Sequence, residues 1–147
     1  MPQGVGMSQG STNANSQFQR VNPESLAAPI GFSHAVTYHG SKIIFLAGQT
    51  ALNKDGVIVG NTIVEQFEKV IENLLTVLRE AGGQPDQLAK LTIFSVNPED
   101  YRAHAREIGK VWHRLLGRDY PAMTLVGVTR LWDKEALLEI EGFAVLP

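Results

Sequence analysis

Two glutamates near the C-terminus, Glu139 and Glu141, have the residue type and the spacing that point most directly to chemistry. They lie within residues 137–143, which are otherwise apolar. Residues two apart in a β-strand project from the same face of a sheet, about 7 Å from each other. Such carboxylates most often lie on the solvated side of an edge strand. The alternative is a polar cleft between subunits, where burial raises the pKa of a carboxyl group and lets it orient a water molecule or transfer a proton.

A glycine and the start of a later strand offer ligand contacts without a reactive group. Gly48 follows Ala47 near the end of an apolar strand, and a glycine there lets a ligand approach the backbone. A simple strand exit accounts for this glycine equally well. Met123 and Thr124 begin another strand, where a methionine is most often a core residue and otherwise a soft apolar wall.

Composition and motifs exclude several classes of site. The 147 residues contain no cysteine, which excludes disulfides, thiolate metal sites and a cysteine nucleophile. The sequence has no glycine-rich phosphate-binding motif, zinc-protease motif or serine-hydrolase motif. A net charge of −2 leaves no basic surplus for binding nucleic acid. We expect no metal site, because the histidines stand at four unrelated positions: His34, His39, His104 and His113. We also expect no cofactor.

Alternating and helical apolar patterns predict five strands and two helices. Thr62 begins the first helix with capping-box spacing, and Gly82 ends it. Asn97 is the expected N-cap of a second helix, which Gly117 ends. The expected strands are residues 32–38, 42–47, 88–96, 123–128 and 136–145.

The order of these elements indicates an α+β fold, with one mixed sheet of five to six strands and two helices on one face. Strands 42–47 and 124–128 nevertheless carry apolar residues on both sides. A strand that is apolar on both sides needs cover on both sides. We therefore expect an obligate homo-oligomer in which a second copy covers the open face of the sheet.

The N-terminal residues 1–17 differ in composition from the rest, being rich in Gln, Ser, Asn and Gly and free of charged side chains. Such a stretch buries too little apolar surface to offset its ordering entropy, so we expect a disordered tail, either native or in part artificial. A single domain would then span residues 18–147. No apolar run is long enough to span a bilayer and no signal peptide is evident, so we expect a cytoplasmic protein that binds neither a membrane nor nucleic acid.

Five short segments, which together cover about residues 18–147, carry a resemblance to a known family: Gly31-Phe32-Ser33-His34-Ala35-Val36, Phe45-Leu46-Ala47-Gly48-Gln49, Asn97-Pro98-Glu99-Asp100-Tyr101, Tyr120-Pro121-Ala122 and Leu138-Glu139-Ile140-Glu141-Gly142-Phe143-Ala144. In this order and spacing they are similar to the RidA (YjgF) family of enamine and imine deaminases. The resemblance implies a chorismate-mutase-like α+β fold and a homotrimer with three ligand clefts between its subunits.

The resemblance also implies roles for individual residues. Active family members hydrolyse imines of 2-keto acids: a glutamate orients the water, an arginine forks the substrate carboxylate, and a tyrosine and an asparagine shape the pocket. The glutamate corresponds to Glu139, and the backbone of the family's Ser-Gly-Gln corresponds to Ala47-Gly48-Gln49. The arginine, the tyrosine and the asparagine are replaced by Met123, Phe32 and Ala105. A charge-assisted fork contributes roughly 1.5–3 kcal/mol, so its loss makes 2-imino acids poor substrates here.

Two functions stay open after this comparison of residues. The first is a RidA-like hydrolase or deaminase that releases ammonia from a less acidic enamine or imine, with Glu139 as the catalytic residue. The second is a non-catalytic small-ligand-binding or regulatory trimer. Cleavage of nucleic acid, which is attached to some family members, is disfavoured by the acidic charge balance. Arg102, Arg106 and Arg130 are the candidates to replace the lost arginine. The residues expected to bind substrate are Phe32, Ala47, Gly48, Ala105, Trp112, Met123 and Thr124.

Overall fold

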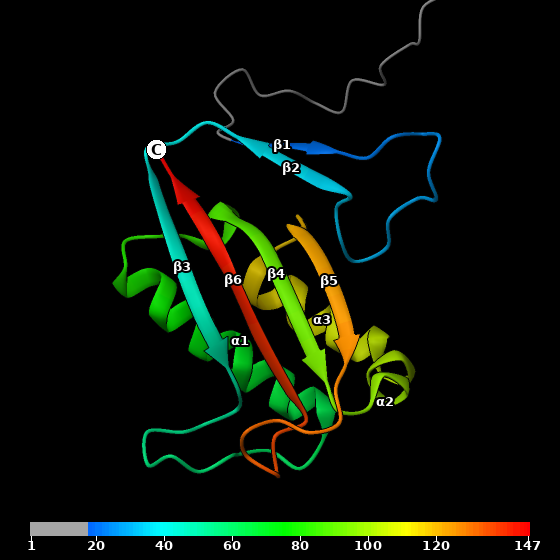
Figure 1. Cartoon of the computed structure of the whole chain (residues 1–147), viewed down its shortest axis with the longest axis vertical. Coiled ribbons are helices and arrows are strands. Elements are labelled where there is room, and N and C mark those ends of the chain that lie inside the picture. Colours follow the sequence, from blue (N-terminus) through cyan, green and yellow to red (C-terminus); the bar gives the residue numbers. More distant parts are fainter. Residues whose placement is uncertain (1–17) are drawn as a thin grey trace, which may run out of the picture.

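The computed structural model describes residues 18–147, and a four-stranded mixed sheet lies at its centre (Figure 1). In the order in which they lie side by side, the strands are β3 (Lys42–Gln49), β6 (Leu138–Leu146), β4 (Leu88–Ser95) and β5 (Ala122–Gly127). β6 runs antiparallel to both of its neighbours, whereas β4 and β5 are parallel. The four strands predicted at these places are confirmed. The predicted tail, residues 1–17, lies outside the described residues.

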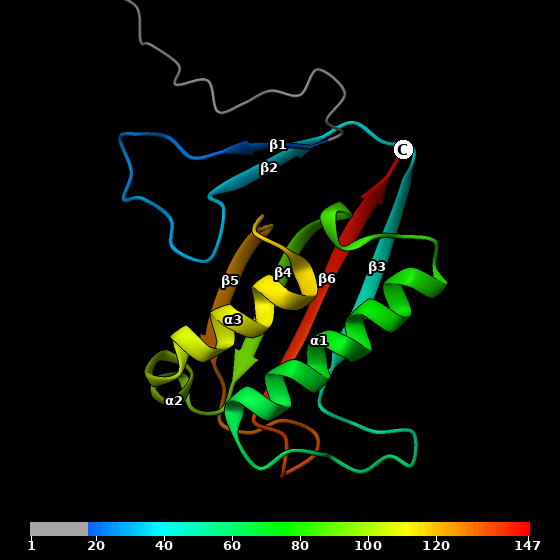
Figure 2. The ribbon, with the colours of Figure 1, turned by 180° about the vertical axis from the view of Figure 1, so that it is seen from behind.

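The handedness of the chain places the helices on one face of this sheet. β3 connects to β4 through α1 (Ile63–Glu80) and the 3-10 helix η1 (Pro85–Gln87), and β4 connects to β5 through α2 (Pro98–Ala103) and α3 (Ala105–Leu116). β3, β4 and β5 run in the same direction, and crossovers between parallel strands are almost always right-handed. Both crossovers also progress the same way across the sheet, so their helices lie on the same side (Figure 2).

The helices begin where their capping residues predict. The hydroxyl oxygen of Thr62 accepts a hydrogen bond from the backbone N–H of Glu65 (3.2 Å). The side-chain oxygen of Asn97 likewise accepts one from the N–H of Asp100 (3.1 Å). The second predicted helix is two helices, because the backbone leaves helical geometry at His104 (φ −108°, ψ 17°). Residues 18–147 therefore contain three α-helices where the sequence pattern predicted two.

The apolar stripe of α1 fills the space between the helices and the sheet. Phe67, Ile71 and Leu78 of this stripe are almost completely buried and belong to one cluster with Leu91 of β4 and Ile140 of β6. Burying a side chain of this size contributes roughly 1.5–3 kcal/mol. This packing fixes α1 against the sheet, so polar groups that α1 presents to the surrounding chain are held at defined places.

The α+β class and the mixed sheet are confirmed, but the prediction of a single sheet is corrected: the strands divide between two sheets. β1 (Phe18–Val21), which was not predicted, pairs with β2 (Ala35–Tyr38) in a separate antiparallel hairpin across the end of the main sheet (Figure 1). Ser33 anchors this hairpin near the start of β5, where its N–H donates to the carbonyl of Pro121 (3.0 Å) and its hydroxyl to the carbonyl of Tyr120 (2.8 Å). These contacts account for the shortening of the predicted strand 32–38 at its first residues.

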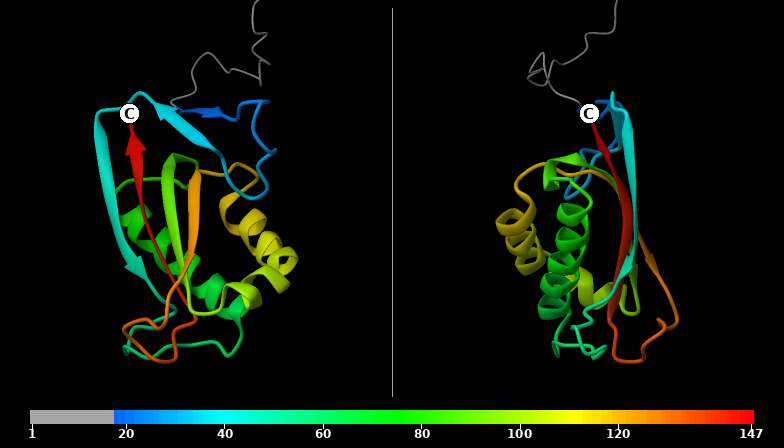
Figure 3. Two further views of the ribbon diagram at one scale, coloured as in Figure 1. Left: turned by 45° about the vertical axis from the view of Figure 1, so that its right-hand side comes forward. Right: turned by 90° about the vertical axis from the view of Figure 1, so that its left-hand side faces the viewer.

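The second face of the main sheet is open. Among the described residues, no helix lies against this face, as the side views in Figure 3 show. Phe45 is 78% exposed and Ile43 is 48% exposed, and Val126 and Phe143 are exposed as well. Phe45 and Phe143 lie beside each other on β3 and β6, with ring centroids 6.0 Å apart. The uncovered apolar face that the sequence predicted is therefore present.

Candidate functional site

Glu139 lies on the open face of the sheet, near the start of β6. Its neighbours Leu138 and Ile140 are completely buried on the helix side. Because successive side chains of a strand point to opposite faces, Glu139 and Glu141 share the open face, as predicted. Glu139 is half-buried, whereas Glu141 is exposed.

The side chain of Glu139 packs directly over Gly48 of β3. A Cβ atom added to Gly48 would lie 2.9 Å from the Cδ atom and 3.0 Å from the Cγ atom of Glu139, and closer still to its Oε1 atom. Gly48 has no positive φ angle, so its backbone does not require a glycine. The glycine therefore makes room for the Glu139 side chain, a reason that neither interpretation of the sequence offered.

A β-bulge produces this contact. The register between β3 and β6 slips after Leu46, so that Ala47 and Gly48 together face one residue of β6. A bulge bends its strand and redirects the side chains around it. The bulge, the missing side chain at position 48 and the half-buried carboxylate thus form one local arrangement.

The carboxylate of Glu139 has an apolar neighbour and no hydrogen-bonding partner in the described chain. Phe94 of β4, which is half-buried, stands opposite Glu139 in the sheet register. Within residues 18–147, no group donates a hydrogen bond to the Glu139 carboxylate and no cation forms an ion pair with it. A carboxylate only accepts hydrogen bonds, so this one is available to a bound water molecule or to a ligand.

Thr124 also faces the open side of the sheet. It pairs with Thr92, which stands opposite Glu141 on the other side of β4. The ammonium group of Lys90 donates a hydrogen bond to the hydroxyl of Thr124 (2.7 Å). Reasoning from the sequence missed Lys90. Its signal was the alternation along β4, in which Lys90 and Thr92 are separated by the buried Leu91.

Met123 faces the other side of the sheet. It pairs with Leu91, which is buried beneath the helices, and it packs against the core. Within one chain, Met123 and Glu139 therefore lie on opposite faces. Trp112 of α3 is only 3% exposed and stacks on the ring of Tyr120, with centroids 5.1 Å apart. Its indole N–H has no acceptor among the described residues.

Phe32 and Ala105 also lie away from Glu139. Phe32 belongs to the connection before β2 and packs edge-on against His34, with ring centroids 5.2 Å apart. Ala105 is exposed at the first residue of α3. The expected site residues thus form two groups: an open-face group of Ala47, Gly48, Thr124 and Glu139, and a rim group of Phe32, Ala105, Trp112 and Met123.

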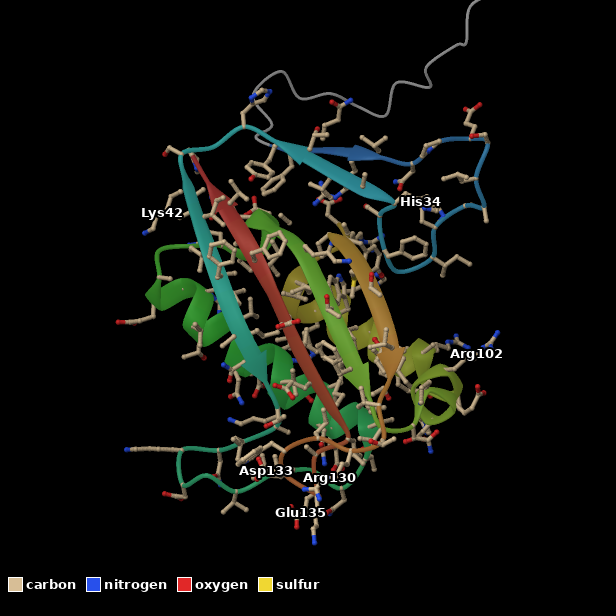
Figure 4. All side chains as sticks on the ribbon, viewed as in Figure 1. His34, Lys42, Arg102, Arg130, Asp133 and Glu135 are labelled. Carbon is tan, nitrogen blue, oxygen red and sulfur yellow. The ribbon has the colours of Figure 1, made fainter. Side chains whose placement is uncertain are left out.

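The three candidate arginines do not reach Glu139 of the same chain. Arg102 of α2 points away from the sheet, and Arg130 lies with the loop where β6 begins (Figure 4). The guanidinium of Arg130 donates to the carbonyls of Leu131 (3.2 Å) and Trp132 (3.1 Å) in its own loop. Arg106 is exposed on α3.

Two tyrosines behind the sheet stay protonated at neutral pH. Burial raises the pKa of Tyr101, whose ring packs edge-on against Phe67 with centroids 6.1 Å apart. Burial also raises the pKa of Tyr120, whose hydroxyl lies 2.9 Å from Nε2 of His113. These phenols can donate hydrogen bonds but are not bases.

No three His, Asp or Glu side chains in residues 18–147 gather closely enough to hold a metal ion. No helix in the same range is both long enough and apolar enough to cross a membrane.

A family model described as "Endoribonuclease L-PSP" matches residues 23–146. The chain belongs to this family, the RidA/YjgF/UK114 family that its sequence resembles. The RutC family protein of Pyrococcus abyssi is 33% identical over 82% of this chain and 91% of its own. The mitochondrial protein mmf2 of Schizosaccharomyces pombe is 36% identical over 84% of this chain and 94% of its own.

Solved structures of Rid-family proteins agree with the fold. The Yersinia pestis protein YyfB, a Rid-family protein of unknown function, is 35% identical over 89% of this chain and all of its own, with a TM-score of 0.79. A second protein of that organism, YyfA, is 30% identical over 88% of this chain and 99% of its own, with a TM-score of 0.62. At almost equal coverage, the RidA-type chain described here superimposes better on YyfB.

Proposed function

We propose that this protein is a small-molecule hydrolase that deaminates a reactive enamine or imine, with Glu139 as the residue that orients the attacking water. The observation that supports the proposal most strongly is the state of this carboxylate. It is half-buried beside Phe94, packs over Gly48 and has no donor among the described residues. A water molecule bound there would have one of its protons directed at the carboxylate.

The reaction would proceed by addition and elimination. The water oxygen bonds to the imine carbon while one water proton passes to Glu139, and the electron pair of the carbon–nitrogen double bond moves to nitrogen, which takes a proton from solvent. Protonated Glu139 then gives its proton to the nitrogen of this carbinolamine. The carbon–nitrogen bond breaks, its electron pair leaves with ammonia, and the hydroxyl group releases its proton to solvent as it becomes the carbonyl of a ketone or aldehyde. An enamine would first gain a proton on carbon and lose one from nitrogen to become the imine. Glu139 ends in its original ionised state, so no other reactant than water is consumed.

The charges around Glu139 favour a substrate without a carboxylate next to the imine carbon. Glu139 and Glu141 on the same face would repel such a group. Lys90 is displaced four residues along β4 from Phe94, the neighbour of Glu139, which is roughly 13 Å in a strand. Its ammonium is therefore too far away to anchor a carboxylate adjacent to the reacting carbon. We propose that 2-imino acids are not the substrates.

The proposal includes a homotrimer whose clefts lie between subunits. The exposed Phe45 and Phe143 favour cover by a second copy, because exposed apolar surface of this kind marks interfaces. In addition, the open-face group and the rim group lie apart within one chain. They would form one cleft only if Glu139 of one subunit met the accessible members of the rim group of another. Because Trp112 is buried, these members are Phe32, Ala105 and Met123.

The alternative is a trimer that binds a small ligand without chemistry, and nucleic-acid cleavage is a weaker candidate. The family description names an endoribonuclease, but the net charge of −2 provides no counterpart for a phosphate backbone. A cytoplasmic location is part of the proposal. It can be tested by fractionation, since one relative, mmf2, is named as mitochondrial.

The test is release of ammonia from imines generated in place by amine oxidases, comparing neutral imines with 2-imino acids. We expect turnover of one or more neutral imines and at least tenfold slower turnover of the acids. Thermal-shift measurements on the same compounds accompany the assay. A compound that raises the melting temperature while no imine is hydrolysed would instead support the non-catalytic trimer.

A further inference from the structure

We infer that two side-chain amides of α1, Gln66 and Asn73, hold Gly48 and Glu139 in the arrangement needed for hydrolysis, and that both are positioning residues. The inference rests on the proposed function for its catalytic part. Its structural part concerns contacts that exist in the chain whether or not the reaction takes place. Neither amide was among the residues singled out from the sequence.

Gln66 fixes the start of β6. It is only 2% exposed, and both the nitrogen and the oxygen of its side-chain amide form hydrogen bonds with backbone groups. Its Nε2 atom donates to the carbonyls of Gly60 and Glu135, both at 3.0 Å. Its Oε1 atom accepts from the N–H of Leu137 at 2.8 Å. Leu137 is two residues before Glu139, so this amide determines where β6 enters the sheet.

Asn73 fixes the end of β3 in a similar way. Its Nδ2 atom donates to the carbonyl of Thr50 (3.0 Å) and to that of Leu52 (2.9 Å). Thr50 is two residues after Gly48 and is buried. The amide therefore holds the chain just beyond the bulge that contains Ala47 and Gly48.

The spacing of the two amides gives them a common function. They are seven residues apart, which is two helical turns, so both lie on one side of α1, separated by about 10.5 Å along its axis. One reaches the strand that carries Glu139 and the other reaches the strand that carries Gly48. α1 itself is fixed by its buried apolar stripe. The helix thus sets the position of β6 relative to β3 at the point where Glu139 crosses Gly48.

This point of the sheet tolerates little movement. The Glu139 side chain occupies the volume that a methyl group on Gly48 would fill. A small slip between the strands would change where the carboxylate lies, and a reacting group displaced by about 1 Å can lose about 100-fold in rate. The two amides are therefore expected to affect the rate of the chemical step more than substrate binding.

The test uses isosteric carboxylate variants, Gln66→Glu and Asn73→Asp. Each variant removes the N–H donors and turns an oxygen toward two carbonyls, but keeps the size of the side chain. Gln87→Glu is the matched control. The Oε1 atom of Gln87 accepts a hydrogen bond from the backbone of Gln84 (2.9 Å) in η1, a bond that a carboxylate can also accept. Gln66→Met also removes the hydrogen bonds of Gln66 but introduces no charge. It replaces Gln66→Glu in the experiment if Gln66→Glu does not fold.

Two readouts are measured on folded variants. In the ammonia assay, we expect kcat to fall at least tenfold with KM within twofold, and Gln87→Glu to match the wild type. In NMR of protein with 13C-labelled glutamate, we expect the side-chain carboxylate signal of Glu139 to change its chemical shift, while that of Glu141 stays in place. The Glu139 signal is assigned with Glu139→Gln.

Unchanged kcat together with an unchanged Glu139 carboxylate signal would overturn the inference. The inference would also be overturned if the NMR signals of Glu139 and Glu141 changed by the same amount while the melting temperature fell. That pattern would indicate a general loosening of the fold. If neither Gln66 variant folds, the Asn73→Asp results decide. If the wild type releases no ammonia, the proposed function fails, and the NMR signals alone decide whether the two amides position Glu139.

Discussion

Replacing Gly48 by alanine is a one-carbon change aimed at the contact between β3 and β6. If Glu139 kept its wild-type position, the Cβ added by Gly48→Ala would lie 2.9 Å from Cδ of Glu139. Ordinary van der Waals contacts begin at 3.4 Å, so Cδ would have to move away by about 0.5 Å. The Oε1 atom lies closer to that Cβ and would have to retreat farther. The Glu139 side chain can do so only by rotating away from the bulge, because β3 and β6 are held by their hydrogen bonds.

The expected cost falls on activity and not on folding. A displacement between 0.5 and about 1 Å corresponds to a roughly ten- to hundredfold loss of kcat, given that about 1 Å can cost about 100-fold. The backbone of Gly48 tolerates a side chain, and a Gly→Ala change at such a position stabilises the folded state by about 0.4–1 kcal/mol through the unfolded chain. This gain offsets the strain of moving Glu139, so we expect a melting temperature within a few degrees of the wild type.

The assay is steady-state ammonia release, with the melting temperature measured on the same samples. Gly109→Ala in α3 is the matched control, because nothing lies within 4 Å of the added Cβ. That variant should keep full activity and gain about 0.5–1 kcal/mol in stability, the usual effect of replacing a helical glycine by alanine. Full activity of Gly48→Ala would refute the reasoning that position 48 lacks a side chain in order to make room for Glu139.

Two further predictions concern assembly and pH. The side chain of Phe45 is 78% exposed, and Phe45→Glu places a charge there. If the proposed trimer buries this side chain, the variant should be monomeric in light scattering, and an intact trimer would assign the interface to another surface. Burial raises the pKa of Tyr101, so the folded state keeps a proton that the unfolded state releases above about pH 10. Stability present below that pH should therefore be lost as the pH rises, and the fall in melting temperature between pH 8 and 11 should be smaller in Tyr101→Phe; an equal fall in both proteins would exclude Tyr101 as its source.

Local chemistry made several elements predictable from the sequence. The caps at Thr62 and Asn97 act within four residues of the chain, so both helix starts could be placed. The two-residue period placed Glu139 and Glu141 on one face and left the apolar face of β3 uncovered, because alternation is a property of the strand itself.

What the sequence did not predict depends on contacts between distant residues. Gly48 makes room for the side chain of Glu139, which is 91 positions away in the sequence. The hairpin of β1 and β2 forms its own sheet because Ser33 bonds to the start of β5, and strands of four residues carry too little pattern to specify their partners. Met123 pairs with Leu91, which turns it toward the helices and away from Glu139 of the same chain, and this separation depends on the order of the strands in the sheet.

The roles of Gln66 and Asn73 were hidden for a related reason. A glutamine and an asparagine within an amphipathic helix are usually exposed polar residues, and nothing in the local pattern marks a buried amide. Their partners, such as the backbone of Leu137 and Thr50, are chosen by the tertiary fold.

The most direct test of the central claim compares Glu139→Gln with Glu141→Gln in the ammonia assay on a neutral imine that the wild type hydrolyses. The two variants make the same chemical change on the same strand and the same face, but only Glu139 is half-buried over Gly48. We predict that Glu139→Gln loses at least 100-fold in kcat with an unchanged oligomeric state, and that Glu141→Gln stays within threefold of the wild type. Activity of Glu139→Gln within threefold of the wild type would contradict the account.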